Sequence, residues 1–160
     1  MKILVVSDTH RKDRVFFDLY DKIKPNMVLH CGDTEGSEDY LEEYCKCPFA
    51  TVKGNCDLFS TNPISRVVTL YDTNILVTHG HYYNVTRGVN KLVEDAKSKN
   101  CSLVLFGHTH VPLLEEHDGV TVVNPGSLGF PRQFSRNPSY AIIEIDEKGF
   151  EVFPEEIYDD

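Results

Sequence analysis

Residues 1–33 read MKILVVSDTHRKDRVFFDLYDKIKPNMVLHCGD, and this stretch decides the fold. Two short apolar runs, Ile3–Val6 and Met27–His30, are typical of buried strands. Between them the spacing predicts a helix from about Asp13 to Lys24, which is expected to end before Pro25. Its apolar side chains recur at helical spacing and share one face: Val15, Phe16, Leu19, Tyr20 and Ile23. A strand–helix–strand unit of this kind predicts two parallel strands.

The same alternation continues beyond residue 33, where short β-branched runs are separated by helical stretches. Helices are expected at about Ser37–Cys45 and Thr86–Lys99. Strands are expected at Ala50–Val52, Arg66–Leu70, Asn74–Thr78, Ser102–Phe106, Val111–Glu116, Val120–Val123, Tyr140–Ile145 and Phe150–Phe153. The first half predicts a parallel sheet and the last part an antiparallel one. Two packed mixed sheets with helices outside, an α/β fold, fit this pattern best.

Length and composition indicate one soluble domain that spans residues 1–160. Of these residues 41% are hydrophobic and 26% are charged, and no linker or repeat divides them. No apolar stretch reaches the roughly 18–20 residues that cross a bilayer. The run Ile3–Val6 is too short for a signal-peptide core. We therefore expect a protein that is neither exported nor inserted in a membrane.

The cysteine pattern favours a reducing compartment, the cytoplasm. The five cysteines are odd in number and irregularly spaced, which does not describe a disulfide framework: Cys31, Cys45, Cys47, Cys56 and Cys101. Cys45 and Cys47 are not followed by a second pair at zinc-ribbon spacing. A structural zinc site therefore has little support.

The charge balance disfavours nucleic acid as a partner. The formal net charge is −9, with 16 lysine and arginine residues against 25 aspartate and glutamate residues. Such a surface repels a polyanion at long range, and we expect no Lys/Arg cluster to counter this locally, although bound metal ions would change the local field. The acidic C-terminal residues Glu155, Glu156, Asp159 and Asp160 are expected to form a solvated tail.

Polar side chains follow five of the predicted strands, at the point where each strand ends. In chain order they are Asp8 and His10, then Asp33, Asn55, His79, and finally His108 and His110. Because ligands of open α/β sheets bind beyond the carboxyl ends of the strands, we expect these side chains to meet at one edge. Each motif alone is more often a turn or a hydrogen-bonded structural histidine. Their recurrence after strand upon strand favours a functional site.

The residue types indicate a class of metal ion. Imidazole nitrogen mixed with carboxylate and carboxamide oxygen suits Mn²⁺, Ni²⁺, Zn²⁺, Fe²⁺ or Co²⁺, whereas Mg²⁺ and Ca²⁺ prefer sites made of oxygen alone. Seven candidate ligands exceed what one ion needs. They fit two divalent ions that share a bridging carboxylate, which lie about 3.5–4 Å apart in two-metal sites.

Taken in order, the motifs resemble those of the calcineurin-like metallophosphoesterase superfamily. They are Asp8-x-His10, Gly32-Asp33, Gly54-Asn55-Cys56-Asp57, His79-Gly80-His81 and Gly107-His108-x-His110. The short length, Cys56 and the later Asn124-Pro125-Gly126-Ser127 resemble its small YfcE-like phosphodiesterase branch. The resemblance covers about residues 1–130, and as an ordered set it is far more specific than any single motif.

This resemblance implies an αββα sandwich of two mixed sheets flanked by helices, which agrees with the layering expected above. It assigns one metal ion to Asp8, His10 and His110, the other to Asn55, His79 and His108, and the bridging position to Asp33. It further implies a hydrolase of phosphate diesters, in which a hydroxide that bridges two ions, Mn²⁺ or Ni²⁺ by preference, attacks phosphorus in line. Metal ions lower the pKa of bound water and neutralise charge on the phosphoryl oxygens.

Beside Asp33 and Asn55, the candidate catalytic residues are Cys56 and His81. Many members of the superfamily have, where this chain has Cys56, a histidine that contacts the phosphate and assists the leaving group. A thiol is a poorer phosphate contact and proton donor, so leaving groups that need little protonation should be favoured. Cys56 is equally compatible with a small buried residue. His81 is a candidate phosphate contact or proton donor, and Asp57 is expected to orient the Asn55 loop.

Three functions compete on this reading. The first is hydrolysis of a small phosphodiester. The second is a non-catalytic protein-interaction scaffold, since the eukaryotic retromer complex contains a subunit that resembles this branch. The third is a nuclease, which the net charge of −9 weakens. A scaffold predicts that some metal ligands have been lost, whereas every ligand position here holds a residue that can bind a metal ion. The sequence carries no signal for the substrate, the native metal or a homo-oligomeric state.

Overall fold

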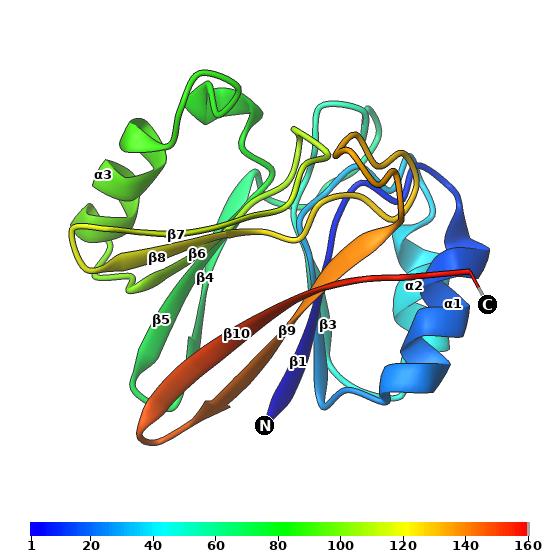
Figure 1. Ribbon diagram of the computed structural model, residues 1–160, viewed down its shortest axis with the longest axis horizontal. Coiled ribbons are helices and arrows are strands. Elements are labelled where there is room, and N and C mark those ends of the chain that lie inside the picture. The colour runs from blue at the N-terminus through cyan, green and yellow to red at the C-terminus, as the bar shows by residue number, and fades with distance from the viewer. Residues whose placement is uncertain (160) are drawn as a thin grey trace.

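The structure is a computed structural model that describes residues 1–159, and it contains two five-stranded sheets (Figure 1). The strands of the first sheet are β1 (Lys2–Val6), β2 (Met27–His30), β3 (Phe49–Thr51), β9 (Ser139–Asp146) and β10 (Gly149–Glu156). Those of the second sheet are β4 (Ser65–Leu70), β5 (Thr73–Thr78), β6 (Leu103–Leu105), β7 (Leu113–His117) and β8 (Val120–Asn124). The helices are α1 (Asp13–Ile23), α2 (Glu38–Tyr44), α3 (Asn90–Ser98) and the 3₁₀ helix η1 (His81–Tyr83).

Parallel pairing at the centre of each sheet brings the carboxyl ends of several strands to one edge. In the first sheet, ordered β10-β9-β1-β2-β3, the strands β1, β2 and β3 are parallel, and Val5 lies opposite Leu29. In the second, ordered β4-β5-β6-β8-β7, the strands β5, β6 and β8 are parallel, and Val77 lies opposite Leu105. The remaining strands pair antiparallel.

The two sheets pack against each other, and helices cover their outer faces (Figure 1). Between the sheets lies a core of aliphatic side chains from both, such as Val5, Leu29 and Leu105. The helices α1 and α2 pack on the first sheet and bury Phe16 and Leu41. The helix α3 packs on the second sheet. The predicted α/β class and its αββα layering are confirmed.

The helix predicted over Thr86–Lys99 is wrong at its start, because it begins only at Asn90. Gly88 has a φ of 145°, which is incompatible with a helix, and the chain turns through this region after η1. Val85 is nevertheless buried against the second sheet. The apolar residues before Asn90 are therefore spaced as in a helix, but the backbone that carries them is not helical.

The prediction that the last strands form an antiparallel sheet is also wrong in part. Strand β8 is parallel to β6, and the β9–β10 hairpin crosses to the first sheet, where β9 pairs with β1. Both β8 and β9 carry buried residues over most of their length, so they fit interior positions of either sheet.

The predicted solvated tail is wrong for Glu155 and Glu156, which belong to β10. The Glu156 carboxylate accepts hydrogen bonds from the side chains of Gln133, Ser135 and Asn137. Asp160 lies outside the described residues.

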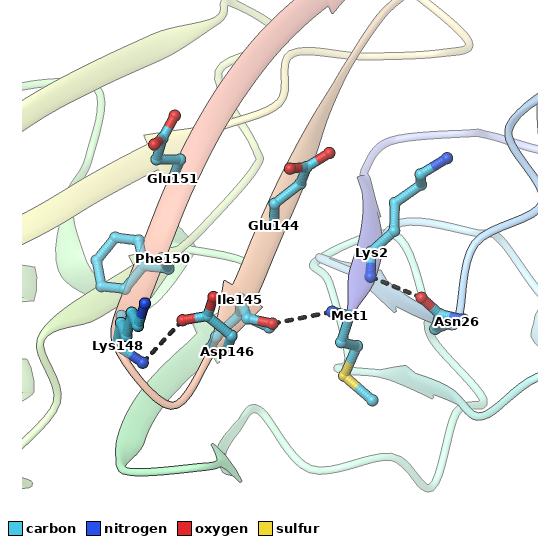
Figure 2. A pocket seen from close by; sticks show the side chains of 10 residues that line it. Met1, Lys2, Asn26, Glu144, Ile145, Asp146, Lys148, Phe150 and Glu151 are labelled. Carbon is cyan, nitrogen blue, oxygen red and sulfur yellow. Dashed lines mark hydrogen bonds between the residues drawn. The ribbon is translucent and has the colours of Figure 1, made fainter.

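The amino-terminal end of β1 lies away from the edge where the strands deliver their polar residues. A hollow of about 640 Å³ opens there (Figure 2). In it the Met1 amine donates to the carbonyl of Ile145, and the Lys2 N–H donates to Asn26. These hydrogen bonds tie the start of β1 to β9 and to the residue before β2.

Within residues 1–159, none of the helices has the length and apolar character that crossing a membrane requires.

Phe16 tests the packing of α1. Replacing this fully buried side chain with alanine is expected to lower the free energy of unfolding by about 3–5 kcal/mol, since it removes a large apolar contact and leaves a cavity. Phe134→Ala makes the same chemical change at a fully exposed position and should cost less than about 0.5 kcal/mol. Urea denaturation followed by circular dichroism measures both, and equal losses would contradict the described packing.

Candidate metal centre

Loops that follow β1, β2, β3, β5 and β6 bring the seven predicted ligand residues to one edge of the sandwich (Figure 1). Five of the seven have a left-handed backbone, with φ between 45° and 72°: Asp8, His10, Asp33, His108 and His110. Such values are uncommon for residues with side chains, and they concentrate at functional sites. Hydrogen bonds between the loops hold these turns, since Asp8 N donates to Gly32 O and His10 N to Asp33 O, both at 3.0 Å.

A first cluster forms around one oxygen of Asp8. Asp8 Oδ1 lies 3.1 Å from His110 Nε2 and 3.6 Å from His10 Nε2, and these two nitrogens are 3.2 Å apart. His110 Nδ1 donates to the carbonyl of Phe130 at 2.7 Å, and His10 Nδ1 lies 2.7 Å from Glu35 Oε1. With Nδ1 of each ring committed to an acceptor, Nε2 of the neutral imidazole presents its lone pair to Asp8.

The buried oxygen Asp8 Oδ1 has no hydrogen-bond partner. It faces Nε2 of His10 and Nε2 of His110. When both rings are neutral, all three of these atoms are hydrogen-bond acceptors. Acceptors that converge in a buried place need positive charge between them. This donor set fits a divalent cation held by nitrogen and oxygen.

A second cluster forms around His79, whose Nδ1 donates to the carbonyl of Cys31 at 2.8 Å. Its Nε2 lies 3.1 Å from Asp33 Oδ2 and 2.9 Å from Asn55 Oδ1. Asn55 Oδ1 is also 3.1 Å from His108 Nδ1. Here too the lone pairs of oxygen and nitrogen atoms converge, so this set has the same chemistry as the first.

The two clusters adjoin. Asp8 Oδ1 is 3.9 Å from His79 Nε2, and Asp33 Oδ2 is 3.9 Å from His10 Nε2. The structure therefore brings all seven predicted residues into one continuous group. Asp33, whose Oδ2 faces a histidine of each cluster, has a position from which a carboxylate can bridge two ions. Their role as metal ligands stays a prediction.

Charge in the cluster shifts several pKa values. Burial alone would raise the pKa of Asp8, but the neighbouring imidazoles of His10, His110 and His79 hold it well below its usual range. Burial opposes protonation of His10, yet the carboxylates of Asp8 and Glu35 raise its pKa to about 9. The pKa of His79 is raised as well, because burial is outweighed by Asp33 and Asp8. A cation that binds these atoms must displace those protons, so metal affinity should rise with pH.

Two glycines allow the loops to come this close. A Cβ on Gly107 would lie 2.0 Å from Ser7 Oγ and 2.6 Å from Asp8 Oδ2. A Cβ on Gly54 would lie 2.1 Å from Asp33 Oδ1. Neither position has a positive φ, so the glycines are needed for space at the carboxylates and not for backbone freedom.

Asp57 and the segment 124–127 hold the loops in place. Asp57 accepts backbone hydrogen bonds from Asp33, Gly54 and Glu35, each at 2.8 Å, which agrees with its expected orienting role. Asn124 donates to the carbonyl of Gly107 at 3.0 Å, and Ser127 Oγ donates to the carbonyl of Asp8 at 2.8 Å. The Asn124–Ser127 motif thus fastens the loops after β1 and β6 from outside the cluster.

Cys56 and His81 lie at the margin of the cluster. The backbone N–H of Cys56 donates to Asp33 Oδ1 at 2.8 Å, while burial and the Asp33 charge raise the pKa of its thiol to about 11. The His81 ring centroid is 5.4 Å from that of His79, and burial lowers its pKa. His30 is fully buried and bonds Thr9, as expected for a core residue.

Two features of the centre had no signal in the sequence. Glu35 contacts His10 Nδ1, yet it follows Asp33 in a loop where a glutamate is unremarkable. The carbonyl of Phe130, which orients His110, could not be found from residue type because any residue supplies one. By contrast, the close contacts between loops have a sequence signal. A glycine directly precedes a predicted ligand in Gly54-Asn55 and in Gly107-His108.

An αββα sandwich with converging carboxylate, imidazole and carboxamide groups at one edge defines an α/β protein with a candidate binuclear metal centre. Residues 1–148 match the calcineurin-like phosphoesterase superfamily domain, and the chain belongs to this superfamily. The family predicted from the ordered motifs is thereby confirmed.

Relatives and a solved structure agree with this membership. The chain is 34% identical over 173 residues to phosphodiesterase YfcE of Escherichia coli, covering 91% of this chain and 89% of the relative. It is 30% identical over 156 residues to vacuolar protein sorting-associated protein 29 of Schizosaccharomyces pombe, covering 92% and 80%. A predicted phosphoesterase of Streptococcus pneumoniae matches with a TM-score of 0.85 at 32% identity, over 97% of this chain and 88% of that structure.

His10 tests the electrostatics of the metal-free centre. Its imidazole is expected to titrate near pH 9 in the presence of a chelator, because Asp8 and Glu35 stabilise the protonated ring. Glu35→Gln should move the pKa back toward the ordinary value of 6.5, since one of the two carboxylates is lost. NMR titration of the histidine ring protons measures the shift, with the exposed Glu116→Gln on β7 as control. A His10 pKa at or below 6.5 in the unmodified protein would contradict the geometry described.

Proposed function

We propose that this chain is a metal-dependent phosphodiesterase that hydrolyses small phosphate diesters. The observation that carries the proposal is the convergence of carboxylate, carboxamide and imidazole atoms around Asp8 Oδ1 and His79 Nε2. Membership of a phosphoesterase superfamily supports the reaction class. The relative YfcE, which is named a phosphodiesterase, supports the diester.

In this proposal Asp8, His10 and His110 hold one divalent ion, Asn55, His79 and His108 hold the second, and Asp33 bridges them. The ions are Mn²⁺ or Ni²⁺ by preference, with Zn²⁺, Fe²⁺ or Co²⁺ as alternatives of the same ligand chemistry. When bound, two such ions lower the pKa of water and neutralise charge on the phosphoryl oxygens. The protein supplies oriented ligands, because a carbonyl or carboxylate fixes Nδ1 of His10, His79 and His110.

Cys56 and His81, which lie beside the centre, are weak proton donors for a leaving alcohol. The thiol of Cys56, with a pKa of about 11, stays protonated near neutrality but is a weak hydrogen-bond donor. The lowered pKa of His81 leaves its ring neutral at pH 7. Departure of the alcohol therefore depends on its own stability as an anion. Diesters with acidic leaving groups should react faster than alkyl diesters and monoesters.

The second candidate function is a non-catalytic interaction scaffold. Its support is the 30% identity to vacuolar protein sorting-associated protein 29. Against it stands the full set of ligand types at all seven positions, which a scaffold does not need. The two functions differ in whether bound metal leads to turnover.

Asp33 provides the direct test of the enzyme. With bis-p-nitrophenyl phosphate and Mn²⁺ or Ni²⁺, turnover is expected, and EDTA should abolish it. Asp33→Asn keeps the size of the side chain but removes the bridging charge, so kcat/KM should fall by about 10³ or more. The exposed Asp72→Asn makes the same change away from the centre and should stay within about twofold.

Two results would count against the enzyme. Activity that survives exhaustive EDTA treatment would refute metal dependence. Full metal occupancy without turnover of any ester would favour the scaffold, with metal content measured by mass spectrometry on the same samples.

A series of diesters tests the weak acid at position 56. We expect rates to fall steeply as the pKa of the leaving alcohol rises, because the Cys56 thiol is a weak acid and the neutral His81 ring carries no imidazolium proton to donate. Cys56→His should flatten this dependence and speed the poorest leaving groups by about tenfold or more. Cys47→Ser, outside the centre, should leave the slope unchanged. A flat dependence in the unmodified protein would show that an acid operates there after all.

A further inference from the structure

A hollow of about 590 Å³ beside the proposed metal centre concentrates positive charge. Two of its lining residues are proposed ligands and three are cations: His10, His110, Lys12, Arg132 and Arg136. The segment 129–131 completes the wall. The Nζ of Lys12 lies 4.0 Å from the ring centroid of Phe130, which is half exposed.

The three cations have no carboxylate within ion-pair distance in the part of the chain that the structure describes. The lysine and arginine ion pairs of residues 1–159 are Arg14–Asp18, Lys97–Asp118 and Lys99–Asp95. Glu156 packs on the loop that carries both arginines, but its carboxylate accepts from Gln133, Ser135 and Asn137. On a chain of net charge −9, unpaired cations around one hollow indicate an anionic ligand.

Hydrogen bonds fix this hollow relative to the centre. The carbonyl of Asp8 accepts from Ser127 Oγ at 2.8 Å and from Gly129 N at 3.0 Å. The carbonyl of His110 accepts from Arg132 N at 3.0 Å, and His110 Nδ1 donates to the carbonyl of Phe130. The cationic wall is thus attached to two proposed ligands, and its distance from a phosphate at the centre is set by the backbone.

A second hollow beside the centre has the other charge. A hollow of about 760 Å³ lies there beside Asn55 and Cys56, and its wall includes Glu35, Glu38 and Asp39 with Arg11 as the one cation. An anionic group is repelled from this acidic hollow and attracted to the cationic one. The two ester arms of a bound diester therefore meet different surroundings.

We infer that the cationic hollow is a subsite for a second phosphate, and that the substrate is a diester in which one arm ends in a phosphate monoester. This inference deepens the proposed function and rests on it. Arg132 and Arg136 suit the terminal phosphate because a guanidinium donates to phosphate oxygens in pairs, and Lys12 adds a point charge. The three residues determine specificity and do not contact the scissile phosphate.

A matched pair of substrates tests the subsite. Thymidine 5′-(p-nitrophenyl phosphate) and its 3′-phosphorylated form release the same p-nitrophenolate and differ only in the terminal phosphate. For the Mn²⁺-loaded protein we expect kcat/KM to be at least about tenfold higher for the phosphorylated form. Arg132→Gln and Arg136→Gln should each reduce this preference by about fivefold or more and leave the plain diester within about twofold.

Arg14→Gln is the control for net charge, because Arg14 is exposed and lies on α1, two residues from Lys12. It should leave the preference unchanged. A preference near one in the unmodified protein would overturn the inference, as would a preference that both arginine variants retain.

A binding measurement separates this inference from the proposed function. Calorimetry with thymidine 3′,5′-bisphosphate and thymidine 5′-monophosphate, in Mn²⁺ and again in EDTA, needs no turnover. We expect tighter binding of the bisphosphate, and loss of that difference in Arg132→Gln and Arg136→Gln. Hydrolysis of neither diester would defeat the proposed function alone. Equal affinities for the two nucleotides would defeat the subsite, whatever the activity.

Discussion

The rest of the centre depends on one buried carboxylate, that of Asp8. It follows the central strand β1 of the first sheet, yet its Oδ2 accepts the backbone N–H of His108, which follows β6 of the second sheet. Its carbonyl is bound by Ser127. A fully buried anion in this position must be balanced by positive charge, from protons on histidines or from a cation. The balance of charge at Asp8 therefore couples the two sheets at the edge where the chemistry is proposed.

The loops around this carboxylate have strained backbone and tight contacts, and packing of the sandwich core compensates for the free-energy cost of both. Left-handed turns at Asp8, Asp33 and His110 are each unfavourable for residues with side chains, and glycine contacts leave no space for even one methyl group. Loops under such conditions keep their shape only if the strands that carry them are fixed. Burial of the β1 side chains from Ile3 to Val6, and of every side chain of β2 and β6, provides that rigidity.

The sequence predicts those helices and strands whose apolar residues are regularly spaced, together with the polar residues that directly follow them. The helix α1, the strand β2 and the polar residue at each strand end were predictable because period and residue type are local properties. The partners of β8 and β9 were not predictable, since both strands are apolar along most of their length and suit either sheet. The cationic hollow was also out of reach, because Lys12 and Arg132 lie 120 positions apart in the chain and meet only through the fold.

The outer edges of the two sheets bear on how the protein behaves at high concentration. An unpaired strand edge invites another molecule to add a strand, which is the first step of aggregation. Here β3 is only three residues long, β7 carries Glu115 and Glu116, and β10 has Pro154 in its second half. Short length, like charge and a missing N–H each oppose intermolecular pairing. Three of the four edge strands therefore oppose the addition of a strand from another molecule by their own sequence.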